Sequence, residues 1–418
     1  MDIKSNIKMA LKELNYSDRN KQQIKAIKSL SDGNDTFIIA GTGFGKTAIY
    51  TTAGYMTKDK LTLVIEPLLA LMHNQVDTLQ KRGVKADYID HTRKDTDDII
   101  KQAVKGKLNF LYVSAERLQY KSFIKQIIKA DIGMIVIDEC HCITQYGYTF
   151  RDAYLKIGDF ISKLRNRPVI CACSATVSKK DISTITDLLN MQQPNIIKCN
   201  LKRNNLILIK KDATYEHKSR EKQEIHRIDI LKKQIKKYHS DGSVIIYCLT
   251  RNAVDFLFDI LEEKYPNQVV RSHSGIEPAK LKNQMEIDFL TGKKKIMIAT
   301  STFSMGIDVP DIELVVHYNS PISMTDYIQQ IGRAGRDGRT AHCVLMYNKS
   351  DDEIVNALKK NNQFKDSKKI INKQYKEVKA FINSTNCMNI DILEYQGEEQ
   401  TNVCKKCTCC ARNRRGKR

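Results

Sequence analysis

The stretch FIIAGTGFGKTAIY, residues 37–50, decides the fold of this 418-residue chain. It opens with a short apolar run that predicts a buried strand, continues with three glycines in five residues, and ends in a segment that can be helical. A strand, a glycine loop and a helix N-terminus together form an arrangement that binds phosphate. We therefore predict an α/β fold built around a nucleotide site.

The loop supplies the side chains that a nucleoside triphosphate needs. Backbone N–H groups around Gly41, Gly43 and Gly45 can surround an anion. Lys46 can reach the β- and γ-phosphates, and the Thr47 hydroxyl can ligate Mg²⁺. The residues that we predict to contact ATP here are Thr42, Gly43, Gly45, Lys46 and Thr47. The alternative is a glycine turn that binds nothing.

The charge and composition point to a partner class. Lysine and arginine outnumber aspartate and glutamate by 69 to 48, a formal charge of +21. Such an excess suggests a polyanionic partner, although a solvated basic surface is the alternative. No apolar run approaches the roughly 18 residues that span a bilayer, and the N-terminus lacks the apolar core of a signal peptide. We expect an intracellular protein without a membrane partner, in which most of the 12 cysteines are reduced thiols.

The first 35 residues show apolar positions at helical spacing, and they contain Tyr16, Arg19 and Gln23. An aromatic ring, a guanidinium and an amide shortly before a phosphate loop can stack on an adenine and hydrogen-bond to it. A solvated helix start accounts for the same pattern, and from the residues alone we favour that interpretation.

Apolar strands alternate with helical segments along most of the chain, which indicates two tandem parallel sheets covered on both faces. After the strand of the phosphate loop, the strands predicted for the first sheet lie at residues 61–65, 108–113, 134–137 and 169–173. Those predicted for the second sheet lie at residues 244–247, 269–273, 296–299, 314–317 and 343–347. Residues 200–240 are polar and rich in lysine, and we place an interdomain boundary near residues 200–205.

Two adjacent carboxylates, Asp138 and Glu139, follow the buried strand at residues 134–137. Such a pair is costly at the end of a buried strand unless it acts on a cation. Asp138 can hold Mg²⁺, while Glu139 can polarise the water that attacks the γ-phosphate. An Asp-Glu pair without catalytic work is the alternative.

The next ten residues, 142–151, contain three aromatic rings and one arginine. A loop of this composition beside the carboxylates can stack on bases and report their presence to the ATP site. The residues that we predict to couple DNA to hydrolysis are His141, Gln145, Tyr146, Tyr148, Phe150 and Arg151. A packed hydrophobic corner is the alternative.

The second predicted domain carries the stretch QQIGRAGRDG, residues 329–338. We expect Arg333 and Arg336 to lie on one turn of a helix, where both can face an anion. In that position they can supply charge to a transferring phosphoryl group, as an arginine finger does. A surface arginine pair is the alternative.

Eight of these stretches, in their order and spacing, resemble the motifs of the RecQ group of superfamily 2 DNA helicases. The matching stretches are residues 40–47 (motif I), 67–76 (Ia), 111–118 (Ib), 138–141 (the DExH box), 174–176 (III), 246–248 (IV), 299–308 (V) and 330–338 (VI). Residues 142–151 stand in the place of the aromatic-rich loop that is typical of RecQ proteins.

The resemblance implies two RecA-like domains, ATP and Mg²⁺ as cofactors, and single-stranded or forked DNA tracked in the 3′ to 5′ direction. It also implies that Asp308 contacts the nucleotide, and that Tyr16 and Gln23 match the ends of the family's adenine-reading segment, with Arg19 one position before its arginine. A role in DNA repair, recombination or replication follows by analogy. A topoisomerase or a single-strand-binding protein is a possible partner on the same ground.

Five cysteines gather after residue 386, and four of them have the spacing of a zinc site. Thiolates at Cys387, Cys404, Cys407 and Cys410 can close a tetrahedral Zn²⁺ site, and the spacing is similar to that of the RecQ zinc-binding subdomain. Cys409 is the spare, and an exchange of its role with Cys410 stays open. A disulfide cluster is the alternative. The basic tail that follows, with Arg412, Arg414, Arg415, Lys417 and Arg418, favours DNA, and we expect it to be disordered.

We divide the chain into an ATP-binding RecA-like domain (residues 1–203), a C-terminal RecA-like domain (204–348) and a helical zinc-binding subdomain with a basic tail (349–418). RecQ enzymes commonly continue into a winged-helix domain and a further helical domain (HRDC). This sequence stops eight residues after Cys410, so we expect neither domain and weak unwinding. Three alternative functions are an RNA helicase, a nucleic-acid-dependent ATPase that translocates with little unwinding, and a zinc-containing DNA-binding scaffold with weak ATPase.

Overall fold

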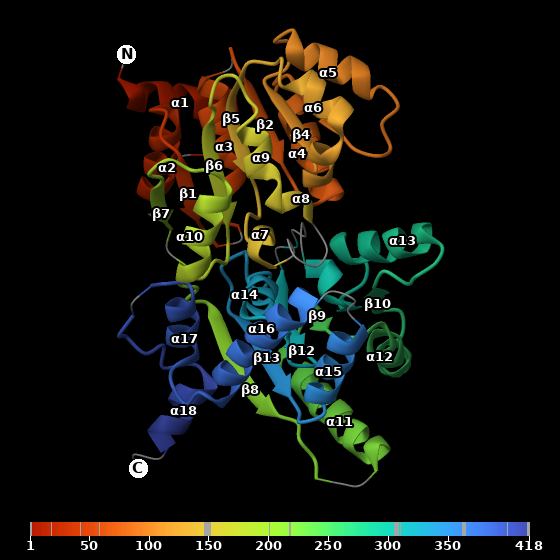
Figure 1. Cartoon of the computed structure of the whole chain (residues 1–418). Coiled ribbons are helices and arrows are strands. Elements are labelled where there is room, and N and C mark those ends of the chain that lie inside the picture. The colour runs from red at the N-terminus through yellow and green to blue at the C-terminus, as the bar shows by residue number, and fades with distance from the viewer. Residues whose placement is uncertain are drawn as a thin grey trace. The chain divides into compact units, whose positions relative to one another are not determined.

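The computed structural model describes most of the chain, in two compact units, Met1–Leu201 and Lys202–Arg418 (Figure 1). The described residues are 2–17, 19–41, 43–57, 59–145, 152–199, 201–216, 219–304, 309, 311–361, 365–398 and 400–415. Among them, no helix combines the length and the apolar character that crossing a membrane would require.

The described part of unit 1 is built on a parallel sheet of seven strands, sheet A, in the order β3-β4-β2-β5-β6-β1-β7. The strands are β1 (Thr36–Ile39), β2 (Leu61–Ile65), β3 (Ala86–Ile89), β4 (Phe110–Val113), β5 (Ile132–Ile137), β6 (Val169–Ser174) and β7 (Asn195–Lys198). Because β2, β5, β6 and β1 are neighbours, their carboxyl ends meet at one edge of the sheet. That edge holds the phosphate loop and the carboxylate pair.

Helices connect the strands of unit 1 and cover the sheet. They are α1 (Ile3–Glu13), α2 (Lys21–Ser31), α3 (Lys46–Met56), α4 (Leu69–Lys81), α5 (Thr96–Val104), the 3-10 helix η1 (Ala115–Gln119), α6 (Lys121–Ile127), α7 (Cys142–Gln145), α8 (Asp152–Leu155), α9 (Ile157–Ile161) and α10 (Lys179–Leu188). One core joins α1 to α4 with alternate strand residues such as Ile38 and Val136. The intervening residues Phe37 and Ile135 are also fully buried, so sheet A is covered on both faces, as predicted.

Unit 2 contains a second parallel sheet, sheet B, with six strands among the described residues in the order β10-β11-β9-β12-β13-β8. The strands are β8 (Leu206–Asp212), β9 (Ser243–Tyr247), β10 (Val269–Ser272), β11 (Ile296–Ala299), β12 (Ile312–His317) and β13 (Ala341–Tyr347). The helices are α11 (Arg220–Tyr238), α12 (Arg251–Lys264), α13 (Ala279–Leu290), the 3-10 helix η2 (Ser301–Ser304), α14 (Met324–Ile331), α15 (Asp351–Asn361), α16 (Lys365–Asn383), α17 (Met388–Tyr395) and α18 (Thr408–Arg415). Helices α11 and α12 pack on one face of sheet B.

The cysteine-containing segment shares a core with the other face of sheet B. Phe381 on α16 and Met388 on α17 are buried in one cluster with strand residues such as Ile245 and Val315. Lys210 on β8 adds polar anchors, because its Nζ donates to the carbonyl oxygens of Phe381 at 3.0 Å, Ile382 at 3.1 Å and Ser384 at 2.6 Å. The end of α16 is thus attached to the edge strand of the sheet.

The structure adds three strands that the sequence pattern did not predict, and all three are edge strands. β3 and β7 close the two edges of sheet A, and β8 closes one edge of sheet B. β3 (ADYI) and β7 (NIIK) lack the continuous apolar run of a central strand, because an edge strand of a covered sheet keeps polar residues. β8 (LILIKKD) does begin with an apolar run, but it lies in the stretch that we interpreted as a polar boundary. The stretch 200–240, which is rich in polar residues, also contains regular secondary structure, namely β8 and the 19-residue helix α11.

Candidate functional site

The phosphate loop leaves β1 and enters α3 through two glycines in left-handed backbone conformations. Gly43 has φ of 79° and Gly45 has φ of 88°, values that side-chain-bearing residues rarely adopt. Gly45 is the N-cap of α3, so the loop delivers the helix N-terminus, with Lys46 and Thr47 in its first turn. This is the strand, loop and helix that the sequence predicts, and it suits an anion. Thr42 lies outside the described residues.

Lys46 and the two carboxylates meet at the carboxyl edge of sheet A. The Nζ of Lys46 lies 3.2 Å from Oε1 of Glu139, and both side chains are largely buried. Asp138 continues β5, since its N–H donates to the carbonyl of Ile65 at 3.0 Å. Glu139 has φ of 47°, a left-handed conformation that is uncommon for glutamate and that turns its side chain out of the strand direction.

A buried histidine supports Glu139 from its other side. Nδ1 of His141 lies 3.2 Å from Oε2 of Glu139 and 3.1 Å from the hydroxyl of Ser174. Burial disfavours the imidazolium, but Cys142 and Glu139 outweigh burial and raise the pKa of His141 to about 10. Lys46 and His141 in turn hold the pKa of Glu139 well below its usual value, although burial opposes them. Glu139 is therefore a carboxylate between two cationic groups.

A third carboxyl group, Glu66, was not predicted from the sequence. It is fully buried directly after β2, beside the strand that ends in Asp138. Its Oε1 accepts from the N–H of Leu68 at 3.2 Å, while its Oε2 has no hydrogen-bond partner among the described residues. Burial and then Asp138 raise the pKa of Glu66 well above its usual value. The criterion that found Asp138, a carboxylate at the end of an apolar strand, would also have found Glu66.

These groups fit a divalent cation. Burial, with the charge of Glu139, raises the pKa of Asp138 although Lys46 opposes it, so an added cation would relieve the clustered negative charge. Oxygen ligands of this kind are those that Mg²⁺ prefers. Asp138 and Thr47 are the residues of this edge that would hold it.

Tyr16, Arg19 and Gln23 gather at the rim of the phosphate loop, which corrects the expectation of a solvated helix start. Gln23 is buried, and its Nε2 donates to the carbonyl of Phe44 at 2.6 Å. The guanidinium groups of Arg19 and Arg82 lie 5.0 and 4.3 Å from the centre of the Tyr16 ring. Together with Gly45, Thr47 and Gln75, among others, Tyr16, Arg19 and Arg82 line a cavity of about 280 Å³. No signal in the sequence pointed to Arg82, because this residue directly follows α4 and is separated from Arg19 by about 60 residues.

The predicted DNA-coupling residues are only partly within the described structure. His141 is placed beside Glu139 as given above. Gln145 ends the short helix α7, but its side chain, like Tyr146, Tyr148, Phe150 and Arg151, lies outside the described residues. Asp308 of the predicted nucleotide contacts lies outside them too.

Arg333 and Arg336 do not share a helix turn, contrary to the prediction. Helix α14 ends at Ile331, and a series of turns follows from Gly332. Gly335 has φ of 57°, and a side chain at that position would meet Asn205 and the carbonyl of Arg339. Glycines at 332, 335 and 338 end the helix in a turn that the arginine spacing alone does not reveal.

Side chains from the start of unit 2 fix this turn. Arg203 donates to the carbonyls of Ala334 and Gly335 at 2.8 Å each, and Asn205 donates to Gly335 at the same distance. Arg333 is buried within the turn. The arginine turn is therefore held rigidly, although it is not helical.

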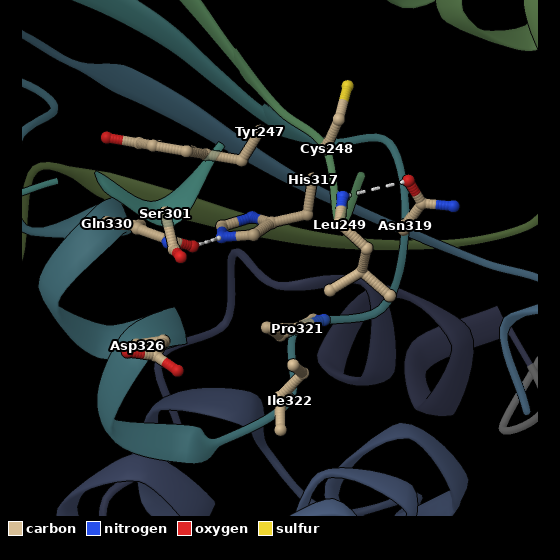
Figure 2. A pocket seen from close by; sticks show the side chains of 10 residues that line it. All are labelled: Tyr247, Cys248, Leu249, Ser301, His317, Asn319, Pro321, Ile322, Asp326 and Gln330. Carbon is tan, nitrogen blue, oxygen red and sulfur yellow. Dashed lines mark hydrogen bonds between the residues drawn. The ribbon is translucent and has the colours of Figure 1, made fainter. Parts of the chain in front are cut away.

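The helix before this turn ends next to a small cavity at the carboxyl edge of sheet B. The cavity measures about 60 Å³ and is lined by residues that include Tyr247, His317 and Gln330 (Figure 2). Nε2 of His317 lies 2.7 Å from Oε1 of Gln330, and Figure 2 shows this contact as a dashed line. Burial lowers the pKa of His317 to about 4, so this imidazole is neutral at physiological pH and donates through Nε2.

Four thiols converge in the C-terminal segment. The Sγ atoms of Cys387, Cys404, Cys407 and Cys410 all lie within 4.8 Å of one another, and those of Cys404 and Cys410 are 3.9 Å apart. A tetrahedral zinc site with bonds of about 2.3 Å has sulfur–sulfur distances of about 3.8 Å, so the four thiols fit Zn²⁺. The Sγ of Cys409 instead donates to the carbonyl of Ser384 at 3.7 Å, as a protonated thiol does.

Backbone N–H groups favour the thiolate form of Cys404, whereas burial raises the pKa values of Cys407 and Cys410. The N–H groups of Lys406 and Cys407 lie 3.5 and 3.3 Å from the Sγ of Cys404. Against the effect of burial, they lower the pKa of Cys404 to about 6. The segment after the cluster is ordered through α18, which contains Arg412, so the basic tail is not disordered as far as Arg415. Residues 416–418, with Lys417 and Arg418, lie outside the described residues.

Comparisons with known proteins agree with this geometry. Residues 20–185 match the DEAD/DEAH box helicase family, and residues 226–338 match the helicase conserved C-terminal domain. The chain is 31% identical over 404 residues to the ATP-dependent DNA helicase RecQ of Bacillus subtilis, covering 96% of this chain and 66% of that protein. It is 30% identical to RecQ of Haemophilus influenzae, covering 94% of this chain and 62% of that protein. It thus spans less than two thirds of these relatives.

The chain is also similar to a viral protein and to two solved structures. A protein of Acanthamoeba polyphaga mimivirus, whose name assigns it provisionally to the ATP-dependent RNA helicases, is 31% identical and covers 94% of this chain and 70% of its own length. Yeast Dbp5 bound to RNA and ADP BeF3 has a TM-score of 0.62 at 18% identity, over 88% of this chain and 97% of its own. Mycobacterium smegmatis Lhr bound to ssDNA and AMP-PNP has the same TM-score and identity, over 83% of this chain and 48% of its own. These structures share the fold, and together with the motifs and the bacterial relatives they lead to one conclusion: the chain belongs to the RecQ group of superfamily 2 helicases.

Proposed function

We propose that this protein is an ATP-dependent DNA helicase that moves 3′ to 5′ along single-stranded DNA and opens forked duplexes. The observation that carries the proposal is the buried constellation of Lys46, Asp138 and Glu139 at the end of a glycine loop and two parallel strands. A role in DNA repair, recombination or replication, at the nucleoid or in the nucleus, goes with DNA as the substrate. Three functional parts, residues 1–203, 204–348 and 349–418, belong to the same proposal.

The residues of unit 1 have distinct tasks in ATP hydrolysis. Lys46 exchanges Glu139 for phosphate oxygens, which leaves Glu139 free to orient and polarise water. His141 keeps Glu139 ionised and oriented while this happens. Asp138 and Thr47 hold Mg²⁺, which supplies charge stabilisation to the phosphate oxygens when bound. Tyr16, Arg19 and Gln23 take the adenine end of the nucleotide, because they gather at the rim of the loop, where Tyr16 and Arg19 line a cavity with Gly45 and Thr47.

Arg333 and Arg336 are proposed to bind the transferring phosphate, and Asp308 a further part of the nucleotide. The rigid turn that carries the arginines supports this role, since an arginine acts on a transition state only when its position is fixed in advance. Arg336→Ala should lose turnover and keep ATP affinity. An equal loss of nucleotide binding would make it a ground-state contact instead.

Residues 141–151 are proposed to couple DNA to hydrolysis, with Gln145, Tyr146, Tyr148, Phe150 and Arg151 as the contacting residues. The link of His141 to both Glu139 and Ser174 supports this, because it connects the start of the loop to the water-activating carboxylate. Tyr146→Ala should therefore lower DNA-stimulated ATPase much more than basal ATPase. A parallel fall of both rates would show that the ring is only core.

The four clustered cysteines are proposed to hold a structural Zn²⁺. With four thiolate ligands the site leaves no position for water, so the ion would stabilise the fold and take no part in catalysis. The packing of the cysteine-containing segment against sheet B supports a role of the site in stabilising unit 2.

An RNA helicase is the second candidate function, and the mimivirus relative favours it. A single set of ATPase titrations separates the candidates, with single-stranded DNA, duplex DNA and RNA as activators at one salt concentration. The proposal expects single-stranded DNA to stimulate most, and Glu139→Gln to remove the stimulated rate. A larger stimulation by RNA would favour the second candidate. No stimulation by any nucleic acid would favour a DNA-binding scaffold.

A further inference from the structure

Two buried residues, Tyr50 on α3 and Gln75 near the end of the motif Ia stretch, connect the two expected magnesium ligands. We propose that Tyr50 and Gln75 are positioning residues that hold Thr47 and Asp138 in place for Mg²⁺ and tie them to helix α4. The inference rests on the proposed ATP-dependent function and adds a further set of residues to its metal site. Neither residue was singled out for this task by the sequence.

The bridge consists of three polar contacts across three elements, two of which share the hydroxyl hydrogen of Tyr50. The hydroxyl of Tyr50 on α3 lies 2.9 Å from Oε1 of Gln75 on α4 and 3.2 Å from Oδ2 of Asp138 after β5. Nε2 of Gln75 lies 3.4 Å from Oγ1 of Thr47 at the start of α3. A path of hydrogen bonds thus runs from Thr47 through Gln75 and Tyr50 to Asp138.

The chemistry of the groups constrains the donors and acceptors of this path. Tyr50 has one hydroxyl hydrogen and shares it between two acceptors, Oε1 of Gln75 and Oδ2 of Asp138, while the amide nitrogen of Gln75 donates to Thr47. A threonine hydroxyl has two acceptor positions, so Gln75 occupies one of them and leaves the other lone pair of Thr47 for a metal ion. A tyrosine hydroxyl is protonated at neutral pH, so that of Tyr50 is a donor.

The surroundings make the bridge rigid. Tyr50 is fully buried and Gln75 is 7% exposed. Both are flanked by core residues of their own helices, Ile49 and Ala53 on α3 and Met72 and Val76 on α4, in one hydrophobic cluster. A side chain that is locked by packing and by two hydrogen bonds can orient a metal ligand with little freedom.

The bridge also links the metal site to the segment between β2 and α4. The N–H of Leu68, the N-cap of α4, donates to the buried Glu66, next to the same carboxylates. Asn74, Thr78 and Leu79 of α4 line the cavity that contains Tyr16. A displacement of α4 would therefore move Gln75, and through it the hydroxyl of Thr47.

The test compares Tyr50→Phe and Gln75→Met, which keep volume and remove the hydrogen bonds, with matched changes on the same helices. Tyr55→Phe removes a hydroxyl of α3 that interacts with Glu13, and Gln80→Met removes an exposed amide of α4 that donates to Ala86. All four variants are made in the full chain and checked for folding by thermal melting.

The main readout is the affinity for Mn²⁺ in the presence of ADP, measured by electron paramagnetic resonance, alongside ADP affinity in EDTA. Loss of an outer partner typically weakens a metal site about 10-fold to 100-fold. We expect at least a tenfold weaker Mn²⁺ affinity in Tyr50→Phe and Gln75→Met, with both controls like the wild type. ADP affinity in EDTA should stay within twofold in Tyr50→Phe, because Tyr50 does not line the cavity that contains Tyr16. The Mg²⁺ concentration for half-maximal ATPase should rise by a similar factor.

Mn²⁺ affinity within twofold of the wild type in both bridge variants would overturn the inference. So would an equal effect of the two control variants. If one bridge variant fails to fold, the other decides. Failure of the proposed function looks different, because the wild-type chain itself would then show no nucleotide-dependent Mn²⁺ binding.

Discussion

Units 1 and 2 present their functional groups in contrasting ways. In unit 1 the charged groups stand directly at the carboxyl ends of β2 and β5, where Lys46 and His141 already neutralise Glu139. In unit 2 the corresponding edge of sheet B carries a neutral histidine, His317, and the reactive groups lie beyond the strands, in a turn and in the cysteine cluster.

The contrast teaches which parts of the protein need a ligand to be complete. Sheet A fixes its site through backbone pairing, so that the nucleotide site is assembled with its charges already paired. The four thiols come from segments up to 23 residues apart and are joined mainly by N–H contacts to sulfur. We infer that unit 1 tolerates ligand removal, whereas the C-terminal part of unit 2 does not.

The largest expected effect is the removal of a zinc ligand. Elemental analysis should find one Zn²⁺ per wild-type chain and none in Cys404→Ser. The midpoint temperature for thermal unfolding of unit 2 should fall by roughly 10 °C, because binding of the metal contributes to the free energy of folding. Cys409→Ser is the control and should keep the metal, since its thiol donates to Ser384. Metal retained in Cys410→Ser but lost in Cys409→Ser would reverse the assignment.

The next effect concerns the unit 1 carboxylate. Glu139→Gln should lower the turnover of ATP by more than about 100-fold, because a general base contributes about 10² to 10⁴. DNA affinity should stay within a few-fold, since phosphate contacts elsewhere set it. Steady-state ATPase and a DNA-binding titration at fixed salt measure both. A variant that keeps more than a few per cent of the turnover would remove Glu139 from the role of base.

A smaller effect tests whether the charges of unit 1 are paired for stability. Lys46→Met leaves Glu139 with one cationic neighbour, His141, and should lower the free energy of unfolding of unit 1 by about 2 kcal/mol. Adding Glu139→Gln should recover part of this loss, because the double variant removes the carboxylate that lies 3.2 Å from the deleted ammonium group. A double-mutant cycle in urea measures the coupling. Strict additivity of the two changes would contradict the paired arrangement.

The smallest effect is a pH dependence of unit 2. Folding lowers the pKa of His317 to about 4, so the unfolded chain binds a proton first and stability is lost as the pH falls below about 6.5. Between pH 7.5 and pH 5.5 the loss should be about 1.4 kcal/mol, and His317→Gln should remove it. His91→Gln, at an exposed position, is the control. An unchanged pH profile in His317→Gln would show that this imidazole does not titrate as described.

His141 in unit 1 should show the opposite sign. Its pKa is raised to about 10, so its contribution is fully present below about pH 6.5 and is lost as the pH rises through 10. The two buried histidines therefore restrict the stable range from opposite sides. Unfolding curves at pH 5.5, 7.5 and 9.5 would separate the two contributions.

The sequence predicted what depends on local pattern. Buried central strands such as β2 and β11 were placed at their observed bounds, because a short, continuous apolar run between polar segments is typical of a strand covered on both faces. The phosphate loop and the carboxylate pair were found because their residue types are rare together. The strands β3 and β7 were missed because an edge strand can be polar. β8 was missed because its apolar residues 206–209 lie in a stretch that is otherwise polar and that we interpreted as a domain boundary.

The remaining errors have a similar cause. Tyr50 lies outside the motif stretches and Gln75 lies within motif Ia, but only the packing of α3 against α4 reveals that their polar groups meet. Arg333 and Arg336 have helical spacing, but Gly335 adopts a left-handed conformation and Arg203 holds the resulting turn. Contacts between residues more than 100 positions apart, such as this one, decide conformations that spacing leaves open.

The attachment of Lys210 has a consequence for biosynthesis. β8 is the first strand of unit 2 to be made, yet it pairs with β13, and the N–H of Lys210 donates to Thr408, 198 residues later. At about 5 to 20 residues per second, a ribosome needs about 10 to 40 s to bridge that interval. Leu206 and Leu208 stay unpaired on the nascent chain until β13 is made, about 135 residues after Leu206, and the adjacent charges of Lys210, Lys211 and Asp212 disfavour pairing of this strand with a wrong partner.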